Sequence, residues 1–315
     1  MSRPLVNKLG LSVLTLFITL VLVFVLLRVV PNNPAEIMLG DAATPETVAQ
    51  ITRLWGLDKP IPEQFVIYLI NLLRGDAGIS FQYSTPGAPI GITVWEIVMG
   101  RLPYTIALAL SSLALSVVVA VPLGVLSASK ADSVLDHSIA TGGIVINSIP
   151  HFWLALILIE IVSVQLHLLP SGGATSPLSI ILPSIMLSIS FTVLLTRVTR
   201  TEVLRIMASD YVRTARAKGL SERTVLWRHA LPNALIPLIT LIGLRLGGLL
   251  NGAVVMEAIF RWPGVGSLML NSIGTRDYPT IQFLVPLTAF AFIVLNFLTD
   301  VIYELVDPRL RKAGK

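Results

Sequence analysis

Long apolar runs alternate with short polar segments over most of this chain of 315 residues. A membrane core about 30 Å thick is crossed by about 20 apolar residues in helical form. Six runs are long enough to cross it: residues 9–30, 102–129, 138–166, 178–196, 234–255 and 278–299. The pattern therefore predicts an all-α, polytopic membrane protein with six transmembrane helices.

Composition agrees with this prediction and narrows the chemistry. Charged residues make up only 13% of the chain and apolar residues 54%, so most of it cannot be the surface of a soluble domain. The formal charge of +5 is explained by Lys and Arg in cytoplasmic loops, and no nucleic-acid partner is expected. The sequence has no cysteine, which excludes disulfides and thiolate metal sites, and we expect no metal site.

Lys and Arg are distributed unevenly between the two sides of the predicted membrane domain. With the N-terminus inside, the inner segments hold 15 of them and the outer segments six. Four of those six fall in the first outer segment, which is too long to count in the positive-inside rule. We therefore expect a multi-pass protein of the cell inner membrane with both termini in the cytoplasm.

The outer segment between the first two runs contains two further helical patterns. Thr44 can cap a short helix in which Pro45 takes the first position and Gly56 lies just past the end. The apolar patch at 63–75 is too short to span, so it predicts an interfacial or packed helix. Together these patterns predict an ordered extracytoplasmic cap.

A basic segment separates the fourth and fifth apolar runs. Ser209 or Asp210 can cap a helix start, residues 211–218 favour a helix, and Gly219 suits the left-handed residue after a helix end. A second helix can begin at Ser221. The pattern predicts a cytoplasmic elbow of two short helices, preorganised to dock on another protein. Contact of its cations with anionic lipid headgroups is the simpler alternative.

The spacing within this elbow resembles the EAA loop of binding-protein-dependent ATP-binding-cassette importer permeases. Ala215 is followed by Gly219 four residues later, and by Leu231 and Pro232 twelve and thirteen residues beyond that glycine. The pattern's Glu and Ile positions are held by Arg213 and His229. The stretch DYVRTARAKGLSE at 210–222 resembles the peptide and nickel branch of that family.

The resemblance extends over nearly the whole chain. The matching blocks are GLDKPIPEQF (56–65), RGDAGISF (74–81), RLPYTIALA (101–109), VPLGVLSA (121–128), WPGVG (262–266), RDYPTIQ (276–282) and DPRLR (307–311). The chain thus looks like the first of two permease subunits of a dipeptide, oligopeptide or nickel importer. The blocks at 260–266 and 276–282 occur in both branches, so they leave a peptide and a nickel or metal-chelate cargo open.

The resemblance implies a type I importer permease fold, with residues 1–93 as first helix and extracytoplasmic segment, 94–303 as permease domain and 304–315 as cytoplasmic tail. It implies a second permease subunit in a heterodimer, two ATPase subunits and an extracytoplasmic substrate-binding protein as partners. ATP and Mg would bind the ATPases, because this non-catalytic chain has no GxxxxGK[ST] loop. The coupling residues implied are Asp210, Tyr211, Arg213, Ala215, Arg216, Gly219, His229, Leu231 and Pro232.

Charged and small residues inside the predicted spans are candidates for the transport pathway. Glu160, Arg245 and Glu257 are costly at membrane depth, so we expect them to line a cavity or to form buried ion pairs. Prolines at 122, 150, 183, 237 and 286 predict kinks. The glycines at 243, 247, 248 and 252 favour a close helix contact, either within this chain or with a second permease.

Two other classes of protein are less consistent with the sequence. An intramembrane enzyme would need a catalytic constellation, but the four histidines are scattered and no GxSxG or HExxH motif is present. A secondary transporter normally shows paired inverted repeats with broken helices, which this pattern lacks. Sensitivity of uptake to ATP depletion rather than to a protonophore would discriminate the importer from the secondary transporter.

Overall fold

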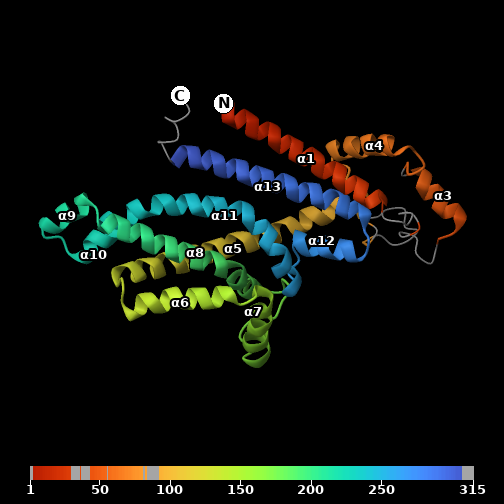
Figure 1. Cartoon of the computed structure of the whole chain (residues 1–315). Helices are drawn as coiled ribbons and strands as arrows, with labels where there is room; N and C mark the ends of the chain where they lie inside the picture. The colour runs from red at the N-terminus through yellow and green to blue at the C-terminus, as the bar shows by residue number, and fades with distance from the viewer. Residues whose placement is uncertain are drawn as a thin grey trace. The chain divides into compact units, whose positions relative to one another are not determined.

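The computed structural model of the chain describes residues 3–29, 36, 43–54, 56–80, 82–83 and 92–306. Helices form most of this part, and its only β-type pairing is an isolated bridge between Ile79 and Thr93. The all-α class predicted from the sequence is confirmed. The helices labelled in Figure 1 are α1 (Arg3–Val29), α3 (Pro45–Leu54), α4 (Ile61–Leu73), α5 (Val94–Ser129), α6 (Val134–Ser148), α7 (His151–Leu158), α8 (Ile181–Met207), α9 (Asp210–Ala217), α10 (Glu222–Thr224), α11 (Leu231–Ile259), α12 (Val265–Gly274) and α13 (Tyr278–Val306).

Four helical stretches in the described residues are long and apolar enough to cross a membrane without a break: Gly10–Leu27, Val94–Ser129, Pro177–Met207 and Tyr278–Phe297. Two bent pairs raise the number to six if each pair is one span: Val134–Ser148 with His151–Gln165, and Glu222–Leu235 with Pro237–Arg245. The bends are 98° and 46°. Each of the six predicted apolar runs overlaps one of these stretches or pairs.

The third span is broken where the sequence predicted a kink. Ile149 takes an extended conformation, with φ −84° and ψ 132°, between α6 and α7. Pro150 causes this break, because its ring disfavours helical geometry in the preceding residue and it has no N–H to donate. The 98° bend is sharper than an ordinary proline kink, and the span ends in a π-helical turn, Ile159–Gln165.

The fourth span differs from the prediction at both ends. It begins with a 3₁₀ turn, Pro177–Ile180, and α8 then continues to Met207, eleven residues beyond the predicted end at Thr196. Pro183 lies in the first turn of α8, where a missing N–H leaves no interior hydrogen bond broken. The kink predicted at Pro183 stays a prediction, whereas Pro122, Pro237 and Pro286 lie inside helices.

By its contacts the chain forms two compact units. The first comprises residues 1–104 and 263–293, and the second comprises residues 105–262 and 294–315. This division cuts through α5 and α13, because a long helix contributes to one unit at one end and to the other unit at its other end. The domain limits at 93/94 and 303/304 come from the family resemblance and not from contacts, and they stay a prediction.

Small side chains let α5 and α8 approach closely in the second unit. The hydroxyl oxygens of Ser111 and Ser184 lie 2.6 Å apart across this contact. A Cβ added to Gly124 would lie 2.5 Å from the Cβ of Thr199, closer than real Cβ atoms come. Apolar side chains from α5, α8 and α11 fill the core beside this contact: Ala120, Phe191, Leu195 and Leu238.

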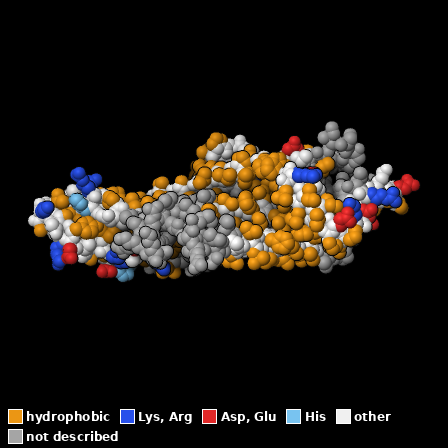
Figure 2. Space-filling model, turned by 90° about the horizontal axis from the view of Figure 1, so that it is seen from above, with side chains coloured by type: hydrophobic (Ala, Val, Ile, Leu, Met, Phe, Trp, Pro, Cys, Tyr) orange, Lys and Arg blue, Asp and Glu red, His pale blue; other side chains and the backbone are white. Residues whose placement is uncertain are grey.

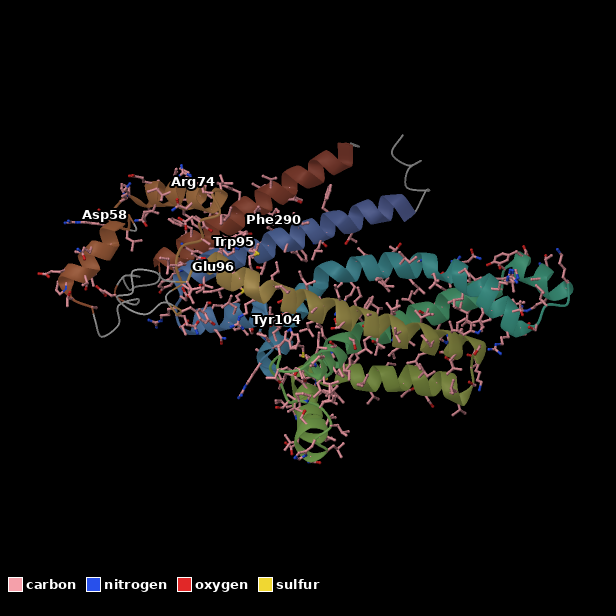
Figure 3. All side chains as sticks on the ribbon, turned by 180° about the vertical axis from the view of Figure 1, so that it is seen from behind. Asp58, Arg74, Trp95, Glu96, Tyr104 and Phe290 are labelled. Carbon is pink, nitrogen blue, oxygen red and sulfur yellow. The ribbon has the colours of Figure 1, made fainter. Side chains whose placement is uncertain are left out.

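In the first unit, the outer segment is ordered by caps and by aromatic packing. Thr44 caps α3 as predicted, because its Oγ1 accepts a hydrogen bond from the Thr47 backbone N–H at 3.2 Å. Phe65 of α4 packs edge-on against Phe24 of α1, with ring centroids 5.2 Å apart. The patch at 63–75 is therefore a helix packed on α1. Figure 3 shows Asp58 between α3 and α4, and Arg74 at the end of α4.

The turn after α4 contacts the start of α13 through a buried carboxylate. Asp277 accepts hydrogen bonds from the hydroxyls of Ser80 and Thr280, the latter at 2.7 Å. The Tyr68 hydroxyl donates to the Gln282 carbonyl at 2.8 Å, and burial raises the pKa of Tyr68. These contacts join two blocks that are about 200 positions apart in the sequence, 74–81 and 276–282.

Candidate functional site

The predicted elbow is present at residues 209–235 and begins with α9. Ser209 precedes this helix in an extended conformation, but its hydroxyl donates back to the Ile206 carbonyl at 2.6 Å and makes no cap hydrogen bond to α9. Asp210 is the first residue of the helix, where a carboxylate favours the positive end of the helix dipole. Asp210 also forms an exposed ion pair with Arg213.

Gly219 makes the corner of the elbow in the left-handed conformation that the sequence predicted, with φ +80°. The Gly219 N–H donates to the Arg216 carbonyl at 2.9 Å, and the Leu220 N–H reaches the Ala215 carbonyl at 3.4 Å. The second of these bonds spans six residues, as in the motif that ends many helices at a glycine. A Cβ at Gly219 would meet nothing within 4 Å, so the constraint on this position is backbone conformation alone.

The second arm of the elbow begins where predicted, because the Ser221 hydroxyl accepts a hydrogen bond from the Thr224 N–H at 3.3 Å. Helix α10 is short and continues as a π-helical turn, Val225–Ala230, directly into α11. Arg216 and Glu222 join the two arms by a bidentate contact of 2.7 and 3.1 Å. The Glu222 carboxylate raises the pKa of Arg216 through this hydrogen bond. Both side chains are exposed, so the pair contributes little stability.

The inner face of the elbow is anchored by apolar packing. Val212 and Ala215 of α9 are buried together with residues of α5, α8 and the second arm: Val125, Ala128, Val203, Ile206, Val225, Ala230 and Ala234. Burying an aliphatic side chain stabilises by about 1.5–3 kcal/mol, so this cluster outweighs the exposed ion pairs of the elbow. The elbow is thereby fixed to the ends of two candidate membrane spans.

The outer face of the elbow combines exposed aromatic and cationic side chains. Tyr211, Leu220 and Trp227 are exposed by 46%, 39% and 52%. Exposed cations lie on the same two arms: Arg213, Arg216, Lys218, Arg223 and Arg228. Figure 2 shows blue Lys and Arg side chains around the end that α9 and α10 form. Aromatic residues and Arg are the side chains most enriched at the energetic centres of protein interfaces.

The residues after the second arm close the elbow onto α11. The Asn233 side-chain amide donates to the His229 carbonyl at 2.8 Å and to the Tyr211 hydroxyl oxygen at 3.2 Å. Leu231 and Pro232 form the first turn of α11, where proline is tolerated. Asn233 was missed by the sequence reasoning, although it follows the predicted Leu-Pro pair directly.

Of the three predicted intramembrane charges, Glu160 lies in the π-helical turn, and Arg245 and Glu257 lie in α11. No ion pair joins Glu160, Arg245 or Glu257 to one another in the part of the chain that the structure describes. Glu257 is fully buried and accepts a hydrogen bond from the Thr105 hydroxyl at 2.7 Å, which links α11 to α5. Glu160 is exposed in the π-helical turn and accepts from the Gln165 amide at 3.3 Å.

Arg245 is the most unusual of the three, because one of its polar atoms has no partner among the residues that the structure describes. Its guanidinium carbon lies 5.6 Å from the centroid of the Phe191 ring, within the range of a cation–π contact. Its Nε is buried and makes no hydrogen bond within the described residues. A buried donor without a partner is costly, which makes this position unusual among the described residues.

Comparison with known proteins identifies the family. A model of binding-protein-dependent transport system inner membrane components matches residues 120–312, and a model of the N-terminal part of such membrane components matches residues 1–109. The chain belongs to this family of permeases. It is therefore a multi-pass component of a transport system, and not a catalytic enzyme.

Two curated relatives match the permease over nearly the full length of both chains. The glutathione transport system permease protein GsiC of Pectobacterium atrosepticum is 38% identical over 94% of this chain and 95% of its own. The oligopeptide transport system permease protein AppB of Bacillus subtilis is 35% identical over 98% and 99%. An inward-facing structure of the MetNI methionine ABC transporter aligns with TM-score 0.55 and 19% identity, over 67% of this chain and 97% of that chain. That likeness shows the importer permease fold.

A buried ion pair beside the elbow of the permease was missed by the sequence reasoning. Arg200 of α8 donates to both carboxylate oxygens of Asp136 in α6, at 2.7 and 2.6 Å. The Ser127 hydroxyl of α5 and the Asp132 backbone N–H also donate to this carboxylate. The cluster ties together α5, α6 and α8. Ser133 caps α6, and Asp136 lies in the first turn of that helix. No feature of the sequence points from Asp136 to Arg200.

In the described part of the permease, no group of three His, Asp or Glu side chains is placed to hold a metal ion. Two sets of expected residues lie outside what the structure describes, namely the block DPRLR at 307–311 and the side chains at 247, 248 and 252. The remaining glycine of that set, Gly243, contacts this chain itself, since its carbonyl accepts from the Thr299 hydroxyl at 3.0 Å.

Proposed function

We propose that the permease forms one half of the translocation pathway of an ATP-driven importer of di- or oligopeptides. Support comes from its family and from relatives that are named for peptide, oligopeptide and glutathione transport. A second permease subunit, two ATPases and an extracytoplasmic binding protein complete the proposed assembly, with both termini of this chain in the cytoplasm. ATP and Mg are bound by the ATPases and not by this chain.

The elbow of α9 and α10 is the proposed site of coupling to an ATPase. The observation that carries this proposal is that the elbow has two different faces. Its inner face packs on α5 and α8, and its outer face exposes Tyr211 and Trp227. A rigid element loses little entropy on docking, so most of the binding energy of its exposed face is available to the partner. Closure of the ATPases then moves the two helices that hold the elbow, because their ends are packed into it.

Arg245 is the proposed pathway residue, with Glu257 as a structural partner of Thr105. The position of Arg245 inside a span, with no partner for its Nε among the described residues, supports this assignment. A peptide carries a terminal carboxylate whose two oxygens can accept hydrogen bonds from a guanidinium. Glu257, by contrast, is enclosed by protein and hydrogen-bonded. Glu160 is exposed near the outer end of the third span and remains a candidate for the pathway entrance.

Transport by the reconstituted complex tests this function. The chain is co-expressed with its partners, inserted in proteoliposomes with ATP inside, and supplied with binding protein and a radiolabelled peptide outside. We expect uptake that stops on ATP depletion and continues with a protonophore. Loss of uptake with the protonophore alone would favour a secondary transporter. Uptake of nickel or a metal chelate instead of peptide would show that the cargo is that of the nickel branch.

Two tryptophans of equal exposure provide a matched test of the docking face. Trp227 in the elbow is 52% exposed, and Trp153 in α7 is 51% exposed. We expect Trp227→Ala to lower co-purification of the ATPase and ATP-dependent uptake at least tenfold, since an interface aromatic typically contributes 2 kcal/mol or more. Trp153→Ala should leave ATPase binding unchanged. Equal ATPase binding by both variants would contradict the docking proposal.

The pathway assignment is tested with two forms of the same peptide. Arg245→Gln should reduce uptake of the peptide with a free C-terminal carboxylate more than uptake of the C-terminally amidated peptide. A purely structural role of Arg245 would lower both equally, and would thereby refute the assignment. ATPase association serves as the control, because Arg245 lies outside the elbow.

A further inference from the structure

A groove between α5, α6 and α8 lies outside the elbow and meets the Asp136–Arg200 cluster only at one end. It encloses about 600 Å³ within the second unit, and helices α5, α6 and α8 line it. Figures 1 and 3 both show α6 running alongside α5 and α8. Its walls are mostly aliphatic, with contributions from each helix: Leu115, Val119, Ile139, Ile146, Ile185 and Ile189.

The hydroxyl groups in the walls do not make the groove polar. Ser138 donates to the Val134 carbonyl at 2.7 Å, Thr192 to Ser188 at 2.9 Å and Thr196 to Thr192 at 2.7 Å. Each hydroxyl proton is thus used within its own helix, so the groove offers few donors to a polar occupant. A cavity of this kind favours hydrocarbon over water.

One end of the groove is cationic. Arg197 and Arg200 of α8 line this end together with Ser127. Arg200 is neutralised by Asp136, and the exposed Asp132 lies 3.9 Å from it, a weak contact in water. The Arg197 side chain is exposed and makes no ion pair or side-chain hydrogen bond within the described residues. Arg197 is therefore the cation that is open to an external anion.

The length and depth of the groove match one leaflet of a bilayer. Twelve residues separate Ile185 from Arg197 along α8, a rise of about 18 Å. Half of a membrane core is about 15 Å thick. Arg197 follows directly on the apolar run 178–196, which places it at the boundary between hydrocarbon and headgroups. The apolar part and the cation are thus spaced like the acyl chain and the phosphate of a lipid.

We propose that this groove binds an anionic phospholipid of the cytoplasmic leaflet, with an acyl chain between α5, α6 and α8 and the headgroup phosphate at Arg197. Basic sites between membrane helices are suited to such headgroups. The leaflet rests on the orientation proposed above, but the binding site itself does not depend on the cargo or on ATP coupling. The lipid would fill the contact between α6 and the two helices that hold the elbow.

The test uses the purified importer complex in detergent, with phosphatidylglycerol and phosphatidylcholine of the same acyl chains as probes. Bound lipid is counted by native mass spectrometry, and thermal stability is recorded in parallel. We expect phosphatidylglycerol to bind more tightly and to raise the melting temperature more. Arg197→Gln should reduce that preference about fivefold, the effect of one cation at an anionic surface. Arg205→Gln, further along α8 and outside the groove, should leave it unchanged.

A second variant blocks the acyl chain. Gly142 lines the groove, and an added Cβ would meet nothing within 4 Å, so Gly142→Leu places a bulky side chain in the groove. This variant should lose both lipids at this site. An unchanged lipid preference in Arg197→Gln would overturn the proposal.

A helix of the second permease subunit is the rival occupant. The chain has no cysteine, so Ile146→Cys gives a single reactive thiol at the groove. Efficient cross-linking of this position to the second permease would overturn the lipid proposal. Absence of cross-linking together with lipid binding supports it. These experiments measure lipid binding and not uptake. Failure of the lipid proposal therefore leaves the importer function untouched, and failure of the importer function leaves the lipid proposal untouched.

Discussion

At the scale of single residues, left-handed backbone positions mark the ends of several helices in this permease. Gly219 takes φ +80° after α9, while Arg261 and Arg276 take φ of 49° and 55° after α11 and α12. Glycine adopts this conformation without a steric penalty, whereas other L-residues pay about 1–2 kcal/mol. The corner that carries the elbow is thus free of the strain that the two arginine positions hold.

Gly219→Val should uncouple ATP hydrolysis from uptake while membrane insertion stays normal. A β-branched side chain disfavours positive φ strongly, so the two arms of the elbow lose their angle. Gly219→Asn is the matched control, because asparagine tolerates the left-handed region. Uptake and ATPase activity in proteoliposomes are compared with the amount of inserted protein. Normal uptake by the valine variant would remove the reason for assigning a role to this glycine.

Asp136→Ala should lower the melting temperature of the purified complex, because it leaves Arg200 partly buried without its carboxylate. Breaking a fully buried pair costs about 3–5 kcal/mol. The cost here should be smaller, since the Arg200 side chain is 30% exposed. Arg200→Ala should be similarly harmful, and the double variant should be less harmful than the sum of the two. Additive losses would show that the pair does not act as a unit.

At the scale of elements, the contact between α5 and α8 is set by the absence of side chains. A Cβ at Gly124 would lie 2.5 Å from the Thr199 Cβ and 2.7 Å from the Thr196 carbonyl oxygen. The second neighbour is backbone and cannot rotate away, so the helices would have to separate. Small residues at such contacts let helix backbones approach, which is a main source of helix association in membranes.

Gly124→Ala should therefore destabilise the permease although alanine is the better helix former. Gly100→Ala, in the same helix, is the control, because its added Cβ meets nothing within 4 Å. Helix propensity alone predicts a gain of about 1 kcal/mol at either glycine. We expect a lower melting temperature for the Gly124 variant and an unchanged or higher one for the Gly100 variant. The same response of both would contradict the close contact.

At the scale of the whole molecule, the proposed orientation places the elbow and the α3–α4 segment on opposite sides of the membrane. Lys218→Cys and Asp58→Cys each introduce one thiol into a chain that has none, at positions exposed in the structure. In intact cells with a permeable outer barrier, a membrane-impermeant maleimide should label position 58 and not position 218. Lysis should make both reactive. Labelling of position 218 before lysis would reverse the topology and exclude ATPase docking there.

Much of the elbow could be predicted from the sequence, because its determinants are local. The positive φ at Gly219 and the Ser221 cap follow from residue types within a few positions. Contacts between distant segments could not be read in this way. Asp136 and Arg200 are 64 residues apart, and Ser80 and Asp277 are 197 apart, so no periodicity points from one to the other.

Hydrophobic periodicity, glycine and capping residues by themselves determined the helical class, the apolar runs and the elbow, since membrane crossing and helix ends depend on short stretches of sequence. Tertiary structure alone decided the length of α8, the 98° angle of the break at Pro150, the pairing of Asp136 with Arg200, and the groove that ends at Arg197. The physical reason is that these features depend on which helices pack together. Packing is fixed by surfaces that many distant residues build jointly.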